Sequence, residues 1–138
     1  MESAKEISLA ATVENLPLVN EFVETLLAEE MVSAKAQMQI ELSVEEVFVN
    51  IANYAYGEAG GKATVQGKIL NEPAGLELVF IDGGQPYDPL SREEPDLEQK
   101  MEDRAIGGLG IYLVKKNMDE VHYAYQQGKN ILTLRKYF

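Results

Sequence analysis

The sequence predicts an α+β fold in which three helices cover a sheet of about five strands, as a two-layer sandwich. Apolar and polar residues alternate in several short segments, whereas apolar residues recur at steps of three or four in the longer ones. The strand-like and helix-like segments are grouped in blocks instead of alternating along the chain. We expect a mixed sheet and a single domain over residues 1–138.

The first part of the chain is expected to hold one strand and two helices. Residues 5–14 alternate apolar and polar side chains, as in a half-buried strand. Asn15 is expected to cap a helix that runs to residue 27. A longer helix is predicted over about residues 33–56, with Gly57 closing it in the left-handed conformation that glycine adopts readily. Its predicted apolar stripe consists of Ile40, Val44, Val47, Ile51 and Tyr54.

Two strands and a long loop come next. Residues 62–70 and 75–82 are predicted as strands joined by a loop rich in turn-forming residues. Residues 83–107 show little periodicity and contain three prolines. Loops of this length in compact domains tend to be functional or mobile, so we expect this segment to act as a lid.

A third helix and a closing hairpin complete the predicted fold. Apolar periodicity predicts a helix over residues 108–118. Residues 120–126 and 131–137 are then expected to form two strands, with Gly128 available for a positive φ in the turn between them. No internal repeat or domain boundary is evident.

Composition and charge exclude several classes of protein. The chain has 46% hydrophobic and 25% charged residues, which is ordinary globular usage. Twelve basic residues against 23 acidic ones give a formal charge of −11, the wrong sign for binding nucleic-acid phosphates directly. No apolar run approaches the roughly 20 residues of a membrane span, and no signal peptide is evident, so we expect a cytoplasmic protein without a membrane partner. Without cysteine there is no disulfide and no thiolate nucleophile or ligand.

Glu46 and Asn50 stand four residues apart on the long predicted helix, so they project from the same face. Asn53 and Gly57 continue that line. A carboxylate and an amide at the edge of a core have the chemistry of a general base and an oxygen ligand for a hard metal ion. Taken alone, this spacing is more typical of a solvated helix face.

Two glycine-rich segments follow. Asp82 passes directly from an apolar strand into a Gly-Gly turn, where it can accept a hydrogen bond from an amino group of a planar ligand, or simply cap the turn. Glycines 107, 108 and 110 lead into an apolar helix, and such a loop presents free N–H groups and the positive end of the helix dipole to phosphate. Neither a Walker A loop nor a dinucleotide fingerprint is present.

The order of these features resembles the Bergerat ATP-binding fold shared by histidine kinases, gyrase-type ATPases and anti-sigma-factor serine kinases. The segment VEEVFVNIANYAYG is similar to the N box of that family, IDGGQPYDP to its first glycine box, and GGLGIYLVKKNMDEV to its second. The Tyr-Asp-Pro after the first glycine box and the Met-Asp-Glu-Val after the second are most similar to the RsbW-type anti-sigma serine/threonine kinases.

The resemblance implies a role for each matching residue. Glu46 would be the general base, and Asn50 would bind a Mg²⁺ ion that arrives with ATP. Asp82 would accept from the adenine amino group, and Gly84 would let the base lie against the turn. The further nucleotide-binding residues that it implies are Asn53, Arg104, Gly107, Gly108, Gly110 and Thr133, where Thr133 would place a hydroxyl near adenine.

The lid departs from part of the family. Some members place an arginine immediately before the second glycine box, where this chain has Ile106. Arg104 and Lys100 are the nearest cations that could neutralise γ-phosphate charge. This departure bears on phosphoryl transfer and not on nucleotide binding.

The family also implies partners. The leading hypothesis is a protein serine/threonine kinase that phosphorylates an anti-anti-sigma (STAS-type) protein and also sequesters a sigma factor. A homodimer through the first strand and helix is expected from the same resemblance. The alternatives are a non-catalytic, ATP-gated interaction module, and a related domain whose partner is not a sigma factor. His122, the sole histidine, is expected to be structural.

Overall fold

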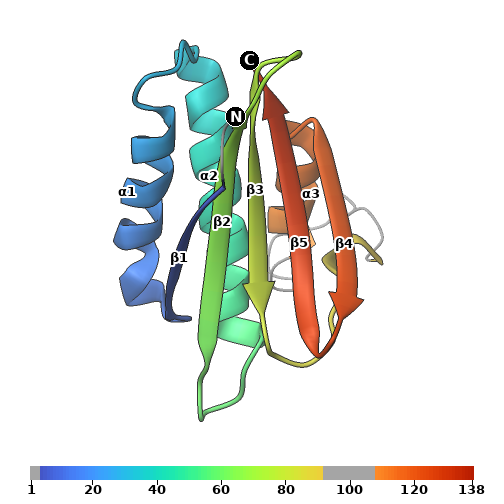
Figure 1. The fold of residues 1–138 in the computed structure, drawn as a ribbon. Coiled ribbons are helices and arrows are strands. Elements are labelled where there is room, and N and C mark those ends of the chain that lie inside the picture. Colours follow the sequence, from blue (N-terminus) through green and yellow to red (C-terminus); the bar gives the residue numbers. More distant parts are fainter. Residues whose placement is uncertain (1–3, 92–107) are drawn as a thin grey trace.

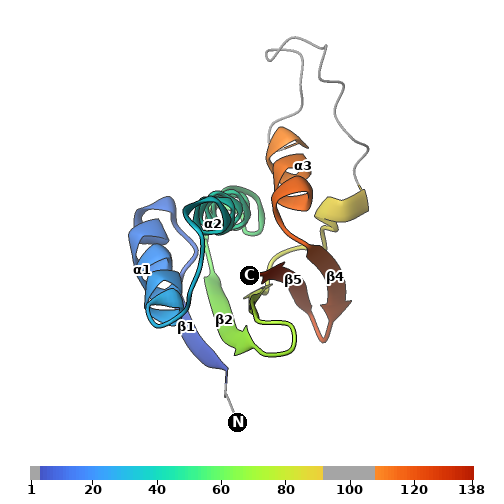
Figure 2. The same ribbon diagram turned by 90° about the horizontal axis from the view of Figure 1, so that it is seen from above.

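The computed structural model describes residues 4–91 and 108–138, and it contains a five-stranded sheet with three helices packed on one face (Figures 1 and 2). The predicted α+β two-layer class is therefore confirmed. The helices are α1 (Leu16–Leu27), α2 (Ala34–Tyr54) and α3 (Gly108–Asn117). The strands are β1 (Lys5–Ala10), β2 (Lys62–Leu70), β3 (Gly75–Asp82), β4 (Glu120–Gln126) and β5 (Lys129–Tyr137).

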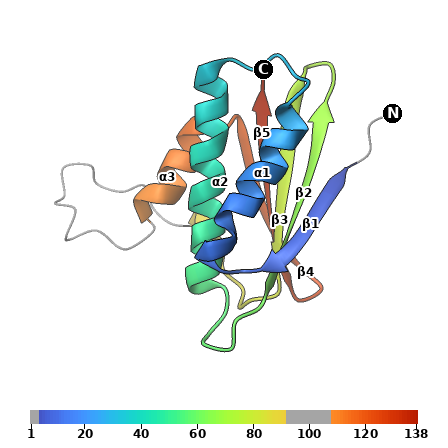
Figure 3. The same cartoon turned by 90° about the vertical axis from the view of Figure 1, so that its left-hand side faces the viewer.

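The sheet is antiparallel throughout, so the expected mixed sheet is wrong. The strand order is β1-β2-β3-β5-β4, and each neighbouring pair is antiparallel. A single helix between two strands would make them parallel. Two helices, α1 and α2, connect β1 to β2, and the second helix reverses the chain once more, so these strands are antiparallel (Figure 3). Strands β3 and β4 run in the same direction, but β5 lies between them and pairs with both.

The two long helices begin differently. Ser33 caps α2, because its hydroxyl accepts a hydrogen bond from the Ala36 N–H at 3.1 Å. Asn15 stands at the start of α1, but its side chain makes no capping bond and donates instead to the carbonyl of Ala10 at 2.8 Å. The backbone of Asn15 is already helical because a 3-10 turn, Val13–Asn15, precedes α1. The predicted side-chain cap is therefore wrong.

The end of α2 also differs from the prediction. The helix ends at Tyr54, and the left-handed glycine is Gly60, with φ of 70°, instead of Gly57. The Gly60 N–H donates to the Gly57 carbonyl at 3.0 Å, so the reversal lies in the connection to β2. In the last hairpin, Gly128 has a φ of 76°, and this prediction is confirmed.

The core lies between the sheet and the three helices. Four members of the predicted α2 stripe are buried, but Tyr54 is 44% exposed because it stands at the end of the helix. These residues pack against apolar side chains of the sheet and of α3, among them Leu78, Phe80, Leu132, Leu134 and Val114. None of the helices in the described part of the chain is long and apolar enough to cross a membrane.

The pairing of β3 with β5 decides which side chains face the helices. Leu78 is opposite Leu134 and Phe80 is opposite Leu132, and all four are buried in the core. Side chains alternate between the faces of a strand, so the next pair on the same face is Asp82 with Asn130. The side chains of Asp82 and Asn130 therefore lie on the face of the sheet that the helices cover.

The open face of the sheet carries a row of charged side chains, which we call the ion-pair ladder: Lys68, Glu77, Arg135 and Glu120. Consecutive members are directly opposite one another on neighbouring strands, from β2 through β3 and β5 to β4. Their nitrogen–oxygen distances are 3.6 Å, 2.7 Å and 3.3 Å in that order. The hydrogen bond to Glu77 raises the pKa of Arg135 above its ordinary value.

Candidate functional site

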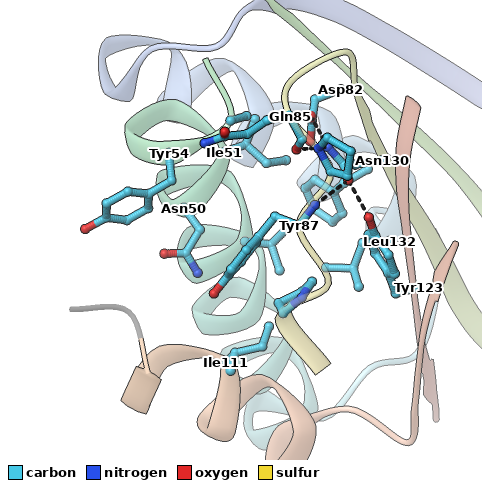
Figure 4. Close-up of a pocket in the computed structure, with 15 residues that line it drawn as sticks. Asn50, Ile51, Tyr54, Asp82, Gln85, Tyr87, Ile111, Tyr123, Asn130 and Leu132 are labelled. Carbon is cyan, nitrogen blue, oxygen red and sulfur yellow. Dashed lines mark hydrogen bonds between the residues drawn. The ribbon is translucent and has the colours of Figure 1, made fainter. Parts of the chain in front are cut away.

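A cavity of about 460 Å³ opens beside the C-terminal half of α2 (Figure 4). Side chains from α2, α3, β3, β4, β5 and the segment after β3 surround it. Its apolar lining includes Val47, Ile51, Phe80, Ile111 and Leu132, and its polar lining includes Asn50, Asp82 and Asn130. A mostly apolar cavity with a few placed polar groups is the usual form of a small-molecule site.

One end of the cavity holds a buried polar pair. Asp82 is 6% exposed and Asn130 is 7% exposed. The Oδ1 atom of Asp82 accepts two hydrogen bonds of 2.9 Å, one from the Gly84 N–H and one from the side-chain amide of Asn130. Burial of a carboxylate is costly unless donors are provided, and these two donors offset that cost.

Asn130 also binds the segment after β3. Its amide nitrogen donates to the carbonyl of Gln85 at 2.9 Å and lies 3.5 Å from the carbonyl of Gly84. Its oxygen accepts from the Tyr87 N–H at 3.1 Å and from the Tyr123 hydroxyl at 2.5 Å (Figure 4). Burial raises the pKa of the Tyr123 hydroxyl above its ordinary value.

Gly84 allows this segment to approach the end of α2. A Cβ atom at Gly84 would lie 2.0 Å from the carbonyl oxygen of Ala55, which is a backbone atom and cannot turn aside. The next residue, Gln85, donates its N–H to the same carbonyl at 3.1 Å. Tyr56 supports the turn from behind, since its hydroxyl accepts from the Gly83 N–H at 2.7 Å and donates to the Lys62 carbonyl at 2.5 Å.

The other end of the cavity is formed by α2 and the first turn of α3. Glu46 is half-buried, and its burial, together with the neighbouring charge of Glu45, raises its pKa. A Cβ atom at Gly110 would lie 2.1 Å from Glu46 Oε2, so the carboxylate packs directly against the first turn of α3. Asn50, one helical turn beyond Glu46, lines the cavity, and its side chain has no hydrogen-bond partner among residues 4–91 and 108–138.

The structure brings Asn50 and Asp82 to one cavity. Glu46, Gly84 and Gly110 lie outside its lining, although Gly84 packs against Ala55, which lines it, and Glu46 packs against Gly110 in the first turn of α3. These residues come from three separate segments of the chain. Gly108 is the first residue of α3, so its N–H belongs to the N-terminal turn of that helix.

Other predicted residues do not reach the cavity. Asn53 is exposed and lies outside its lining. Thr133 pairs with Val79 on β3 and, between the buried Leu132 and Leu134, points to the open face of the sheet. The structure thus contradicts the expectation for Thr133. The predicted sites at Lys100, Arg104 and Gly107 lie outside the described residues.

Asn130 is a site residue that the sequence does not point to. The sequence predicts a hairpin turn at residues 127–130, whereas β5 begins at Lys129. The signal is present in the strand period, because Leu132 and Leu134 are the inward positions and a period of two then places residue 130 inward as well.

No group of three or more His, Asp or Glu side chains in the described part of the chain could hold a metal ion by itself. An amide oxygen at residue 50 can supply one ligand, and the remaining ligands would have to come from water and from a bound phosphate. This donor set fits Mg²⁺, which keeps several waters and binds proteins largely through substrate phosphates.

Comparison with known protein families identifies the class of this domain. The chain belongs to the histidine kinase-like ATPase domain family, whose sequence profile matches residues 9–136. This membership implies ATP binding.

The relatives are distant in sequence, and both of those described here are named as protein kinases. A Listeria monocytogenes protein named serine-protein kinase RsbW is 30% identical over 105 residues, which cover 72% of this chain and 66% of that protein. A Bordetella bronchiseptica protein named serine/threonine-protein kinase BtrW is 27% identical over 129 residues, which cover 94% of this chain and 89% of that protein. The chain therefore spans about two thirds of the RsbW relative and most of the BtrW relative.

Solved structures show the same fold. The crystal structure of the RsbU and RsbW domains of a Mycobacterium tuberculosis protein superposes with a TM-score of 0.68 at 17% identity, covering 97% of this chain and 32% of that chain. The histidine kinase domain of a blue-light-activated histidine kinase from Erythrobacter litoralis gives a TM-score of 0.56 at 14% identity, covering 93% of this chain and 61% of that chain.

Proposed function

We propose that this chain is an ATP-dependent serine/threonine kinase acting on an anti-anti-sigma (STAS-type) protein, and that its wider partners include a sigma factor. The observation that carries the proposal is the position of Glu46. Its carboxylate packs against the first turn of α3, and Asn50 stands one helical turn away in the lining of the cavity that contains Asp82. The names of the distant relatives support the reaction class.

In the proposed complex the two ends of the cavity have different tasks. Asp82 accepts a hydrogen bond from the amino group of adenine, and the apolar walls enclose the base. The phosphates extend toward α3, whose N-terminal N–H groups favour an anion. Asn50 would supply an oxygen ligand to Mg²⁺, which would neutralise phosphate charge when bound.

Glu46 would act as the general base. It would take the proton from a serine or threonine hydroxyl of the partner as that oxygen forms a bond to the γ-phosphorus. The bond between the γ-phosphorus and the bridging oxygen breaks, and ADP leaves with that electron pair. Burial raises the pKa of Glu46 above its ordinary value, which makes its carboxylate a stronger base than that of an exposed glutamate.

Nucleotide binding is tested by thermal unfolding with saturating Mg·ADP or Mg·ATP, with and without EDTA, on the wild type and on Asn50→Ala. A ligand at 100 times its Kd stabilises the folded state by about 2.7 kcal/mol, which raises the Tm of a domain this size by several degrees. We expect this rise to require Mg²⁺ and Asn50. A Tm unchanged by either nucleotide would remove the proposed site.

Phosphoryl transfer is tested with Glu46→Gln. The substitution should lower the rate of transfer from ATP to STAS-domain proteins by at least about 100-fold and leave ADP affinity intact, because general bases contribute about 10²–10⁴-fold. Glu41→Gln, an exposed glutamate earlier on α2, is the matched control and should transfer at the wild-type rate. Equal rates for Glu46→Gln and the wild type would disprove the kinase mechanism.

Ile106 supports a second candidate function. Part of the resembling family has arginine immediately before the second glycine box, and this chain has a neutral residue there. In this alternative, nucleotide binding controls the affinity for a protein partner without transfer. Bound ATP would then stay intact over hours in the presence of the partner, while partner affinity would still depend on the nucleotide.

A further inference from the structure

We propose that Asn130 is a positioning residue that makes the cavity selective for a base with an exocyclic amino group over a base with an oxo group at the same position. The inference rests on the proposed nucleotide-binding function and adds to it a residue and a basis for selectivity. It follows from which hydrogen-bonding groups of Asn130 and Asp82 are used within the protein and which remain for a ligand.

The amide of Asn130 is fully engaged within the protein. A carboxamide has two N–H donors and an oxygen with two lone pairs. The donors reach Asp82 Oδ1 and the Gln85 carbonyl, and the oxygen accepts from Tyr87 and Tyr123. The orientation of the amide is therefore fixed, since a reversed amide would set donors against donors. Asn130 has no group left with which to contact a base.

Asp82 keeps one oxygen for a ligand. Its Oδ1 atom accepts from Gly84 and from Asn130, whereas Oδ2 has no hydrogen-bond partner among residues 4–91 and 108–138. Asp82 also lines the cavity. A carboxylate oxygen only accepts, so it favours an amino group and repels an oxo group.

Asn130 therefore fixes the orientation of the Asp82 carboxylate. It donates to Oδ1 of Asp82, and it bonds to Gln85 and Tyr87 on either side of Pro86. The free oxygen of Asp82 and the cavity wall formed by residues 85–87 are thus held in one position relative to each other. A hydroxyl side chain at this position has one donor and could not make these bonds at once. The selectivity depends on the carboxamide and not merely on a polar residue.

The test compares the Kd values of Mg·ADP and Mg·IDP, whose bases carry an amino and an oxo group at the same position, by isothermal titration calorimetry. The wild type should prefer ADP by at least about tenfold, since a hydrogen bond to a charged group contributes about 1.5–3 kcal/mol. Asn130→Asp keeps the shape but sets a carboxylate against Asp82, and Asn130→Ala removes the amide. In both variants ADP affinity should fall at least about tenfold, and IDP affinity less than about threefold.

The matched control is Thr133→Val, on the same strand but on the opposite face of the sheet. It should keep the wild-type preference for ADP. Equal losses of ADP and IDP affinity in the Asn130 variants would reduce Asn130 to a structural role and overturn the inference. A preference that survives in both variants would overturn it while leaving the proposed function intact. Binding of neither nucleotide to the wild type would overturn both.

A measurement on the wild type keeps the inference testable if the variants do not fold. The side-chain amide hydrogens of Asn130 should exchange slowly with solvent in NMR spectra, both in the free protein and with Mg·ADP. Exchange as fast as that of the exposed Asn53 amide would show that the amide is not engaged, and the inference would fail.

Discussion

The two ends of the cavity differ in how their polar groups are held. At the Asp82 end, both members of the buried pair are bonded to main-chain or side-chain partners before any ligand arrives. At the Glu46 end, the side chains of Glu46 and Asn50 have no hydrogen-bond partner among the described residues. Among the described residues, hydrogen bonds therefore fix the polar side chains of the Asp82 end and do not fix those of the Glu46 end.

This difference has an energetic reason. A buried carboxylate such as Asp82 must be satisfied for the chain to fold. Glu46 and Asn50 are only half-buried, so water satisfies them in the free protein at little cost. A rigid end suits selection of a base, whereas groups that must exchange protons or bind a hydrated ion benefit from remaining accessible.

The largest effect is expected from breaking the rigid end at Gly84. Gly84→Ala places a Cβ atom against the backbone carbonyl of Ala55 and threatens the adjoining hydrogen bond of Gln85. We expect the free energy of unfolding to fall by about 2–3 kcal/mol in urea denaturation, with loss of ADP binding. In the control, Gly83→Ala, the nearest atoms are the Lys129 Nζ at 3.2 Å and a hydroxyl at 3.5 Å, and a lysine side chain can move. An equal loss in both variants would contradict the proposed rigidity.

The corresponding change at the other end, Gly110→Ala, should cost far less stability. Its Cβ atom would meet the tip of the Glu46 side chain, which can turn away, and alanine favours a helix over glycine by up to about 1 kcal/mol. We expect stability within about 1 kcal/mol of the wild type. Phosphoryl transfer should nevertheless fall about tenfold, because the carboxylate is displaced from the first turn of α3. A loss of stability as large as that of Gly84→Ala would erase the difference between the two ends.

The smallest effect concerns the charge of Glu46. Its raised pKa means that the folded chain holds this proton more tightly than the unfolded chain, so the ionised form weakens the fold at neutral pH. Glu46→Gln should therefore be more stable than the wild type at pH 7, by less than about 0.5 kcal/mol because solvent screens a half-buried group. The advantage should vanish below the ordinary pKa of 4.5, where both states are protonated. Urea denaturation at pH 7 and pH 4 measures this, and a destabilised variant at pH 7 would contradict it.

The helices and strands of this chain are more predictable from its sequence than the junctions between them. Periodicity located the helices and strands because burial of one face of each element determines it. The predictions for Asn15 and Gly57 are wrong because a helix end can be formed in several ways. Here a 3-10 turn precedes α1, and a later glycine makes the reversal after α2. Propensity alone does not choose among these solutions.

The residues of the candidate site also differ in how far the sequence predicts their positions. A helix turn and a strand end predict where Glu46, Asn50 and Asp82 project, but only the family resemblance indicates that they belong to one site. Residue type alone favours the hydroxyl of Thr133, whereas the strand register places Asn130 opposite Asp82 and Thr133 opposite Val79. Asn130 is bonded to Asp82 and to the Gln85–Tyr87 segment, which are more than 40 residues away in sequence, so no local pattern indicates its role.

The ion-pair ladder on the open face has a consequence for the fidelity of folding. A slip of one residue between β3 and β5 would turn Asn130 outward and Thr133 inward, and it would destroy the site without removing any residue. The same slip would separate Glu77 from Arg135, which are directly opposite in the observed register. Each partly buried pair stabilises the fold by only about 1 kcal/mol, but the ladder spans four strands and favours one alignment over its neighbours. The ion-pair ladder on the open face thus favours the strand register that places Asn130 beside Asp82 on the helix-covered face.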